Sequence, residues 1–169
     1  MLPCATRLLV AWALAWALAW PGLARADSSR WTESTRLLVG VETRLRFLAE
    51  MPSPAERAAR SYLVAIVWRY ADDGGERLLP SLTDALRLVR AEHLIEDGIE
   101  RRGIGMLAGA MTGGLQHEWL YYTADPKAFA HAFNRLAVDM PDWPVRLLTE
   151  PDPNWDAYLL LRRQEFALR

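Results

Sequence analysis

The side chains best suited to chemistry are histidines beside carboxylates, which occur in two pairs. Glu92-His93 lies late in a predicted helix, and His117-Glu118 begins a predicted hairpin strand. If the pairs met in space, they could form a metal site or a small hydrolytic centre. Metal-binding histidines usually follow spacings such as H-x-x-x-H or H-E-x-x-H, which this chain lacks. We therefore predict no metal, and keep as the alternative function a small periplasmic hydrolase or metal-dependent enzyme that uses Glu92, His93, His117 and Glu118.

Other routes to catalysis find little support. Ser81 is accounted for as a helix cap and Thr112 as a hairpin residue, and the chain has no G-x-S-x-G motif. The glycines between Gly103 and Gly114 fall on a strand and its turn, not between a strand and a helix N-terminus, so they form no phosphate loop. Asp125 and Asp152 each precede a proline, and helix capping explains both. We predict no cofactor and no catalytic residue.

The first 26 residues resemble a cleavable secretory signal. Arg7 supplies the positive charge, Leu8 to Trp20 form the apolar stretch, and Ala24-Arg25-Ala26 is an A-x-A cleavage site. An uncleaved membrane anchor is the alternative, but this stretch is short of the roughly 20 residues that a spanning helix needs. We expect cleavage after Ala26, a periplasmic or secreted protein, and contact with a membrane only through the signal.

Removal of the signal changes the composition that matters. Arg7 and Arg25 leave with it, so 18 of the 20 basic residues face 21 acidic ones, a formal charge of −3. This charge gives no support for nucleic-acid binding. Cys4 also leaves, so neither disulfide nor thiolate chemistry is available. The remaining chain is long enough for one domain with a hydrophobic core.

The N-terminal part of this domain is ambiguous in the sequence. Residues 27–36 are polar and are expected to be a loose lead-in. Between Arg36 and Ala49 apolar and charged residues alternate, which favours a strand, although a helix through Leu37, Val41, Leu45 and Leu48 is also possible. We assign residues 27–60 to an N-terminal extension, a strand or hairpin packed on the main domain.

Residues 61–169 carry a clearer pattern. Tyr62–Tyr70 is rich in β-branched and aromatic residues and is the best strand candidate. The later predicted elements are a helix from Ser81 to about Gly98, strands over Ile104–Met111 and His117–Thr123 with a turn at Thr112-Gly113-Gly114, a helix from Asp125-Pro126, a strand over Val145–Thr149 and a short helix from Asp152-Pro153. The order βαββαβ predicts an α+β, ferredoxin-like sandwich with an antiparallel sheet and both main helices on one face.

The hairpin and the C-terminus resemble a bacterial family known as domain of unknown function number 695. Members tend to show a basic residue and a glutamate, then aromatics ending in tyrosine, then Asp-Pro, as in His117 to Pro126 here. They typically close with Asp-Pro-x-Trp-x-x-Tyr, which matches Asp152 to Tyr158. His117 stands where arginine is usual. The resemblance covers roughly Ser81 to Tyr158 and brings no established activity.

At fold level the chain is also similar to the regulator of ribonuclease E activity B, a ferredoxin-like protein that acts by binding an enzyme. This likeness favours a binding role by analogy. The regulator is cytoplasmic, whereas this chain is expected to be exported, so ribonuclease E is not expected to be its target.

Aromatic residues supply the predicted contact surface. On the second hairpin strand, His117, Trp119 and Tyr121 share one face, and Glu118, Leu120 and Tyr122 share the other. Core packing accounts for such residues, but a partly open cluster could bind a protein, a peptide or a glycan. We predict a non-enzymatic binding or regulatory module of undetermined oligomeric state. Its candidate binding residues are His117, Glu118, Trp119, Tyr121, Trp155 and Tyr158.

Overall fold

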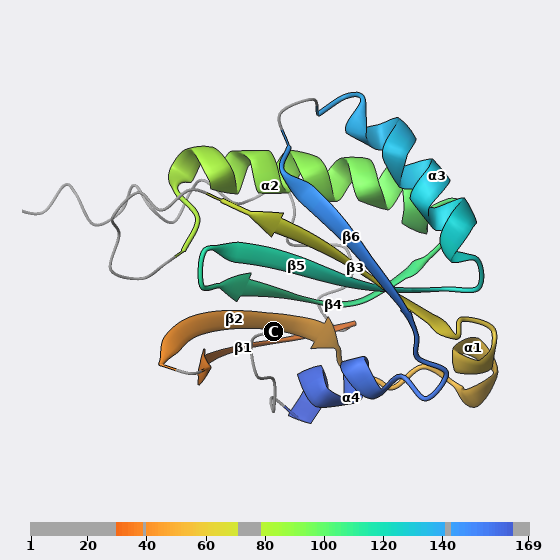
Figure 1. Cartoon of the computed structure of the whole chain (residues 1–169). Helices are drawn as coiled ribbons and strands as arrows, with labels where there is room; N and C mark the ends of the chain where they lie inside the picture. Colours follow the sequence, from red (N-terminus) through yellow and green to blue (C-terminus); the bar gives the residue numbers. More distant parts are fainter. Residues whose placement is uncertain (1–29, 39, 71–78, 141–142, 164–169) are drawn as a thin grey trace, which may run out of the picture.

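The computed structural model describes residues 30–38, 40–70, 79–140 and 143–163 (Figure 1). The predicted signal peptide lies outside these residues. Among the described helices, none is both long enough and apolar enough to cross a membrane.

One antiparallel sheet of six strands organises the molecule, with the strand order β1-β2-β4-β5-β3-β6. The strands are β1 (Trp31–Leu38), β2 (Val41–Leu48), β3 (Tyr62–Arg69), β4 (Met106–Gly113), β5 (Gln116–Thr123) and β6 (Val145–Pro151). The β1–β2 hairpin continues the sheet beside β4 instead of covering a face. β1 and β6 are therefore the two edge strands of the sheet.

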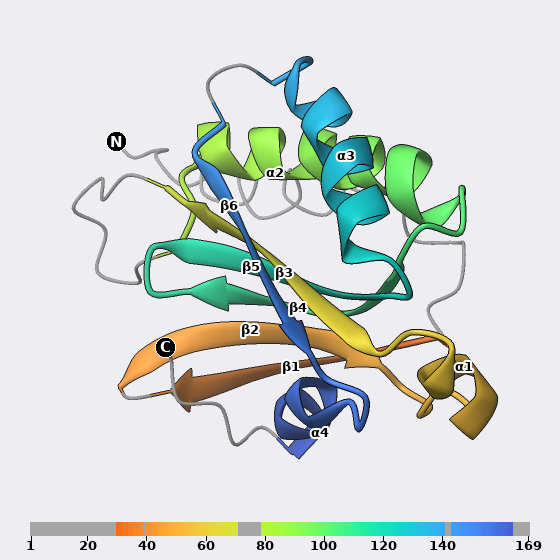
Figure 2. The same cartoon turned by 45° about the vertical axis from the view of Figure 1, so that its right-hand side comes forward.

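The helices are α1 (Pro54–Ala58), α2 (Leu82–Ile95), a π-helical turn η1 (Glu96–Glu100), α3 (Pro126–Ala137) and α4 (Asp156–Arg163). Helices α2 and α3 lie over one face of the sheet, which we call the α2/α3 face, and α4 lies against the other, the α4 face (Figures 1 and 2). The predicted α+β class is confirmed, as is the chain order β3-α2-β4-β5-α3-β6.

Local capping explains where two of these helices begin. The Ser81 hydroxyl accepts a hydrogen bond from the Asp84 N–H and donates one to the Asp84 carboxylate. The Asp125 carboxylate accepts from the N–H groups of Lys127 and Ala128, and Pro126 follows at the first helical position, where it needs no donor. The predicted starts of both helices are confirmed.

Each face of the sheet has its own hydrophobic core, because successive strand residues point to opposite sides. On the α2/α3 face the large buried side chains include Ile66, Trp68, Trp119, Tyr121 and Phe129. On the α4 face they include Phe47, Leu120, Tyr122, Trp155 and Tyr158. The sheet is therefore the shared middle layer of a three-layer arrangement.

The structure corrects the interpretation of the N-terminal extension. Residues 31–38 form strand β1, so most of the expected loose lead-in is paired with β2. The helix considered for Arg36–Ala49 is wrong, since β2 runs from Val41 to Leu48. Gly40 lies in the turn between the strands with φ of +81°, a backbone conformation that glycine adopts without steric cost.

Two boundaries also differ from the sequence prediction. The hairpin turn between β4 and β5 is Gly114-Leu115, with φ of +60° and +63°, so Thr112 and Gly113 belong to the strand. Helix α4 begins at Asp156 and not at Pro153. Trp155 has φ of +62°, outside the right-handed helical region, so the helix starts after it.

Candidate functional site

A polar cleft of about 410 Å³ opens on the α2/α3 face, between the β1–β2 hairpin and helix α2. Strand alternation brings Arg46 of β2 and His117 of β5 to this face, and α2 contributes Glu92. The residues that line the cleft are Glu33, Ser34, Thr35, Arg44, Leu45, Arg46, Leu88, Glu92, Ala110, Thr112 and His117. Charged groups of both signs therefore surround one hollow.

His117 is the most deeply buried polar group in the cleft, with 3% of its surface exposed. Its Nδ1 shares a hydrogen bond of 2.7 Å with the hydroxyl of Thr112, the residue opposite it on β4. Its Nε2 is buried and has no hydrogen-bond partner among the described residues. Burial, assisted by the positive charge of Arg46, lowers the pKa of His117 to about 3, so the ring is neutral at ordinary pH.

Arg46 is held by an aromatic ring. Its guanidinium carbon lies 4.4 Å from the centre of the Trp31 ring, a cation–π arrangement. Its Nε is buried without a hydrogen-bond partner in the described part of the chain. Glu33 is the residue opposite Arg46 on β1. The Trp31 ring restricts the guanidinium, so its buried donor is fixed beside the cleft.

Glu92 supplies the acidic group from the helix side. Burial raises its pKa, while the charge of Arg46 and a hydrogen bond from Trp119 lower it, and burial is the largest effect. Arg46 and Glu92 interact electrostatically but form no ion pair within 4.0 Å. The cleft thus brings together a cation, a neutral imidazole and a carboxyl group whose pKa burial raises.

Only part of the predicted His–Glu cluster assembles. His117 and Glu92 line the same cleft, as the alternative enzyme would require. Glu118 lies on the α4 face, where it lines a different groove, and His93 is exposed on α2. Within the described residues, no three His, Cys, Asp or Glu side chains lie close enough to hold a metal ion.

The predicted open aromatic surface is wrong. Trp119, Tyr121, Trp155 and Tyr158 are each at most 2% exposed, because helices cover both faces of the sheet. Trp119 and Tyr121 pack in the core beneath α2 and α3, whereas Trp155 and Tyr158 belong to the core beside α4. These four side chains cannot reach a partner without unfolding part of the domain.

The C-terminal motif instead builds the second core. The buried Asp152 carboxylate accepts hydrogen bonds from the N–H groups of Asp156 and Ala157 and from the Tyr122 hydroxyl, the last at 2.6 Å. The Trp155 ring stacks on Tyr122 at 3.7 Å between centres, with an angle of 5°. The Asp152 carboxylate therefore caps α4, although Asp152 stands four residues before the helix begins. Burial, together with the hydrogen bond to Asp152, raises the pKa of Tyr122.

Two further bonds attach this motif to distant parts of the chain. The Trp155 indole donates to the carbonyl of Arg60 at 3.0 Å, and the Tyr158 hydroxyl donates to the carbonyl of Leu48 at 2.8 Å. Because every polar atom in these contacts is satisfied within the protein, the Asp-Pro-x-Trp-x-x-Tyr motif has a structural role here.

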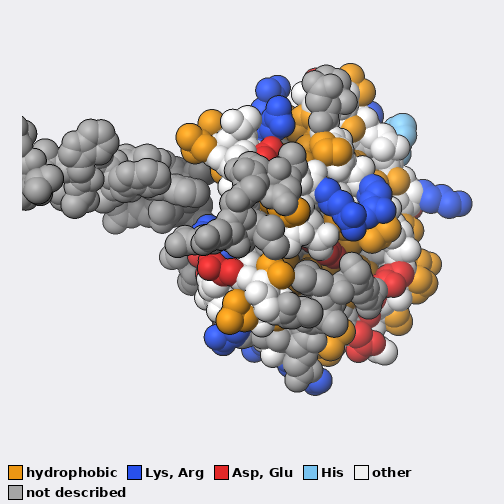
Figure 3. All heavy atoms as spheres, turned by 60° about the vertical axis from the view of Figure 1, so that its left-hand side comes forward, with side chains coloured by type: hydrophobic (Ala, Val, Ile, Leu, Met, Phe, Trp, Pro, Cys, Tyr) orange, Lys and Arg blue, Asp and Glu red, His pale blue; other side chains and the backbone are white. Residues whose placement is uncertain are grey.

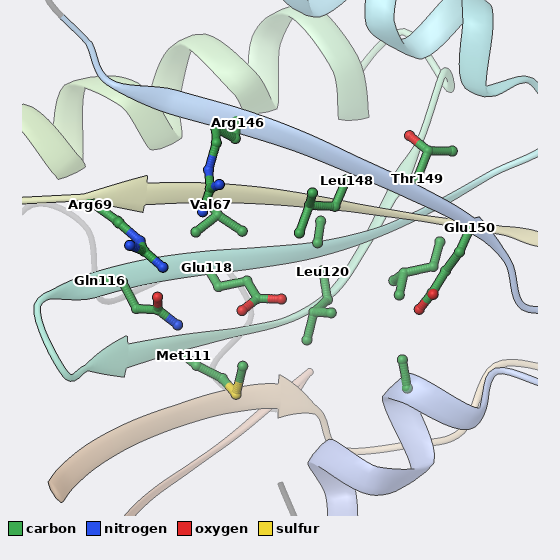
Figure 4. Close-up of a pocket in the computed structure, with 13 residues that line it drawn as sticks. Val67, Arg69, Met111, Gln116, Glu118, Leu120, Arg146, Leu148, Thr149 and Glu150 are labelled. Atoms are coloured by element: carbon green, nitrogen blue, oxygen red, sulfur yellow. The ribbon is translucent and has the colours of Figure 1, made fainter. Parts of the chain in front are cut away.

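A second hollow of about 340 Å³ lies on the α4 face, where α4 leaves the sheet open (Figure 4). Its floor is apolar and includes Val67 and Leu120, and Arg69, Glu118 and Arg146 surround it. Figure 4 shows Arg146, Leu148 and Glu150 reaching from β6 toward this groove. Glu118, predicted as a binding residue, is half-buried here.

The surface in Figure 3 shows hydrophobic, acidic and basic groups interspersed over the visible described residues. They do not gather into one large basic patch on that face.

Comparisons with known proteins identify a family but no activity. A sequence model described as a family of unknown function, DUF695, matches residues 38–161, so the match begins well before the Ser81–Tyr158 segment that carried the resemblance. No curated protein and no solved structure matches the chain. The ferredoxin-like assignment and the likeness to the regulator of ribonuclease E activity B therefore stay predictions. Because the family match spans most of the sequence, the chain belongs to the DUF695 family.

Proposed function

We propose that this protein is an exported, non-enzymatic binding module that receives a polar ligand in the cleft lined by Arg46, Glu92 and His117. The observation that carries this proposal is the presence of three buried polar atoms beside one cleft, Ser34 Oγ, Arg46 Nε and His117 Nε2, which have no hydrogen-bond partner among the described residues. Buried polar groups are nearly always hydrogen-bonded, and leaving one unsatisfied costs about 1–3 kcal/mol. These atoms have almost no solvent-accessible surface, so a ligand that bonds to them must first displace the side chains that close the cleft over them. It would then recover part of this free energy.

The protonation of the cleft favours binding over catalysis. A general base works best when its pKa is near the operating pH. With a pKa of about 3, the His117 ring is a very weak base and serves better as a hydrogen-bonding group. Arg46 is a permanent donor. The ligand we expect presents oxygen acceptors to Arg46 and a hydroxyl or amide group to His117, as a glycan or a peptide does.

Ligand binding can be tested with disaccharides and dipeptides as probes, by NMR titration of the chain that begins at Asp27. We expect a binder to lose roughly tenfold or more in affinity on His117→Phe, which removes the ring nitrogens. His131→Phe, an exposed helix position, is the matched control and should bind as the wild type does. Binding unaffected by His117→Phe would refute the assignment of the cleft.

The same variants address the enzymatic alternative. Glu92 is the one acid of the predicted cluster that lies beside His117, so Glu92→Gln is the informative change. Turnover of a small substrate by the wild type that disappears in this variant would overturn the non-enzymatic proposal in favour of a hydrolase.

Export is proposed from the sequence of the first 26 residues and has its own test. Large residues at the small positions of an A-x-A site block signal cleavage. We expect the wild-type protein to begin at Asp27 after expression in a bacterium, and Ala26→Leu to remain uncleaved. N-terminal sequencing of the periplasmic and membrane fractions measures both, and an intact Met1 in the wild type would contradict the proposal.

A further inference from the structure

Among the described residues, no strand pairs with the outer edge of strand β6. Along its other edge β6 pairs with β3, and it ends the six-stranded sheet (Figure 2). Five of its seven residues are exposed, among them Leu148 with 53% of its surface. Open sheet edges present unpaired N–H and C=O groups and readily accept another strand. Pro144 and Pro151 bracket the segment, so its free backbone donors lie between them.

We propose that two copies of this chain associate through antiparallel pairing of their β6 strands, with Leu148 of each copy opposite Leu148 of the other. A two-fold axis perpendicular to the sheet at Leu148 produces this arrangement, and the two sheets become one. Such an interface uses the same surface on both copies, as two-fold dimers do. The inference is independent of the proposed ligand cleft, which lies beside the opposite edge of the sheet.

Charge complementarity supports this register. With Leu148 at the centre, Arg146 of each copy lies opposite Glu150 of the second copy, so the interface contains two pairs of opposite charge. All three side chains point to the α4 face, since their partners on β3, namely Val67, Ala65 and Leu63, do so. Directly opposite side chains of opposite charge stabilise a strand pair, and like charges destabilise it.

The neighbouring registers lack this match. Residues that lie opposite each other in a strand pair point to the same face of the sheet. A two-fold axis perpendicular to the sheet must therefore pass through a residue, because an axis between two residues would place side chains of opposite faces against each other. Centred on Leu147, the pairing puts Arg146 opposite Leu148. Centred on Thr149, it puts Leu148 opposite Glu150. Arg146 then lies opposite Asp152, whose buried carboxylate already accepts hydrogen bonds from Tyr122 and from the start of α4. The Leu148 register alone of these three pairs Arg146 with Glu150.

The other edge strand, β1, does not offer the same complementarity. Its charged residues are Glu33 and Arg36, which are three positions apart and so point to opposite faces. No pairing that preserves the faces can place one opposite the other.

The groove on the α4 face provides space beside the interface. Arg146, Leu148 and Glu150 all line it, so their side chains have room to meet their counterparts (Figure 4). Glu150 already interacts within its own chain, and a carboxylate with two acceptor oxygens can keep such a contact while it faces a guanidinium. Pairing would also bury Leu148 against its counterpart.

Sedimentation equilibrium of the chain that begins at Asp27, which contains every described residue, tests the proposal. We expect the wild type to dimerise reversibly. Arg146→Glu and Glu150→Arg each place two pairs of like charge across the axis, and each should weaken dimerisation roughly tenfold or more. The doubly substituted chain, R146E/E150R, restores opposite charges and should dimerise as the wild type does.

Mixing the two single variants gives the sharpest result. A heterodimer of R146E with E150R contains two opposite-charge pairs, so the mixture should dimerise although each variant alone remains mainly monomeric. Leu37→Asp, an exposed position on β1, is the control that should leave dimerisation unchanged. A monomeric wild type at millimolar concentration, or a dimer insensitive to both charge reversals, overturns the proposal. Circular dichroism verifies that each variant is folded.

Discussion

Replacing His117 with phenylalanine should make the protein less sensitive to acid. In the folded state the pKa of His117 is lowered to about 3, from 6.5 for an exposed histidine, chiefly by burial and secondly by the charge of Arg46. Between these two values the unfolded chain binds a proton at this position and the folded chain does not. Acid therefore favours unfolding in this window, and the stability of the wild type falls as the pH falls from 6.5 toward 3.

The linkage relation gives the size of this effect. Between these two pKa values, each pH unit changes the free energy of unfolding by about 1.4 kcal/mol. When the pH is lowered from 7 to 5, only the part below 6.5 lies in this window, so the wild type should lose about 2 kcal/mol through His117 alone. Glu92 and Glu100 act in the opposite sense because burial raises their pKa values. Their contribution largely cancels when wild type and variant are compared at the same two pH values.

Urea unfolding monitored by circular dichroism at pH 7 and pH 5 measures the difference. We expect the wild type to lose about 2 kcal/mol more than His117→Phe over this interval. His131→Phe removes an exposed histidine and should behave as the wild type does. Equal losses in the wild type and His117→Phe, within about 0.5 kcal/mol, would show that burial does not hold His117 neutral. The ring would then be basic enough to act as a general acid or base.

Three further substitutions test the packing by urea unfolding. Tyr122→Phe removes the hydroxyl that joins Asp152 to the Tyr158 N–H and should destabilise the fold by about 2 kcal/mol, whereas Tyr62→Phe, on the neighbouring strand, should cost almost nothing; equal effects would contradict the network. Gly109→Ala would bring a Cβ against the Leu161 side chain and within 2.8 Å of the Arg46 carbonyl, so about 1–3 kcal/mol should be lost, and an unchanged urea midpoint would refute this close packing. Asp125→Ala should cost about 1 kcal/mol and Asp125→Asn less, because asparagine still caps; an equal loss in both would show that capping is not the role of Asp125.

Features set by local chemistry could be predicted from the sequence. The strand at β3 follows from its β-branched and aromatic residues, and the starts of α2 and α3 follow from Ser81 and from Asp125-Pro126. The position predicted for the β4–β5 turn, Thr112-Gly113-Gly114, is wrong. The turn requires a positive φ at Leu115, and leucine rarely adopts one, so its presence did not indicate a turn.

Features set by long-range packing could not be predicted. Strand β1 is polar and is a strand because it pairs with β2. Alternation already separated His117 from Glu118, and this signal could have excluded their joint use in one site. The alternation of side chains along β5 could not show which face of the sheet lies under α2. That Glu92 and His117 line the same cleft could therefore be seen only in the tertiary structure. Arg46 was not singled out because charged residues are common on exposed strand faces.

The bonds from the C-terminal motif have a consequence for the order of folding. Trp155 bonds to Arg60, 95 residues earlier, and Tyr158 bonds to Leu48, 110 residues earlier. Contacts so distant in sequence form slowly, because the intervening chain must first be ordered. The core on the α4 face cannot close until residues near 158 have been synthesised.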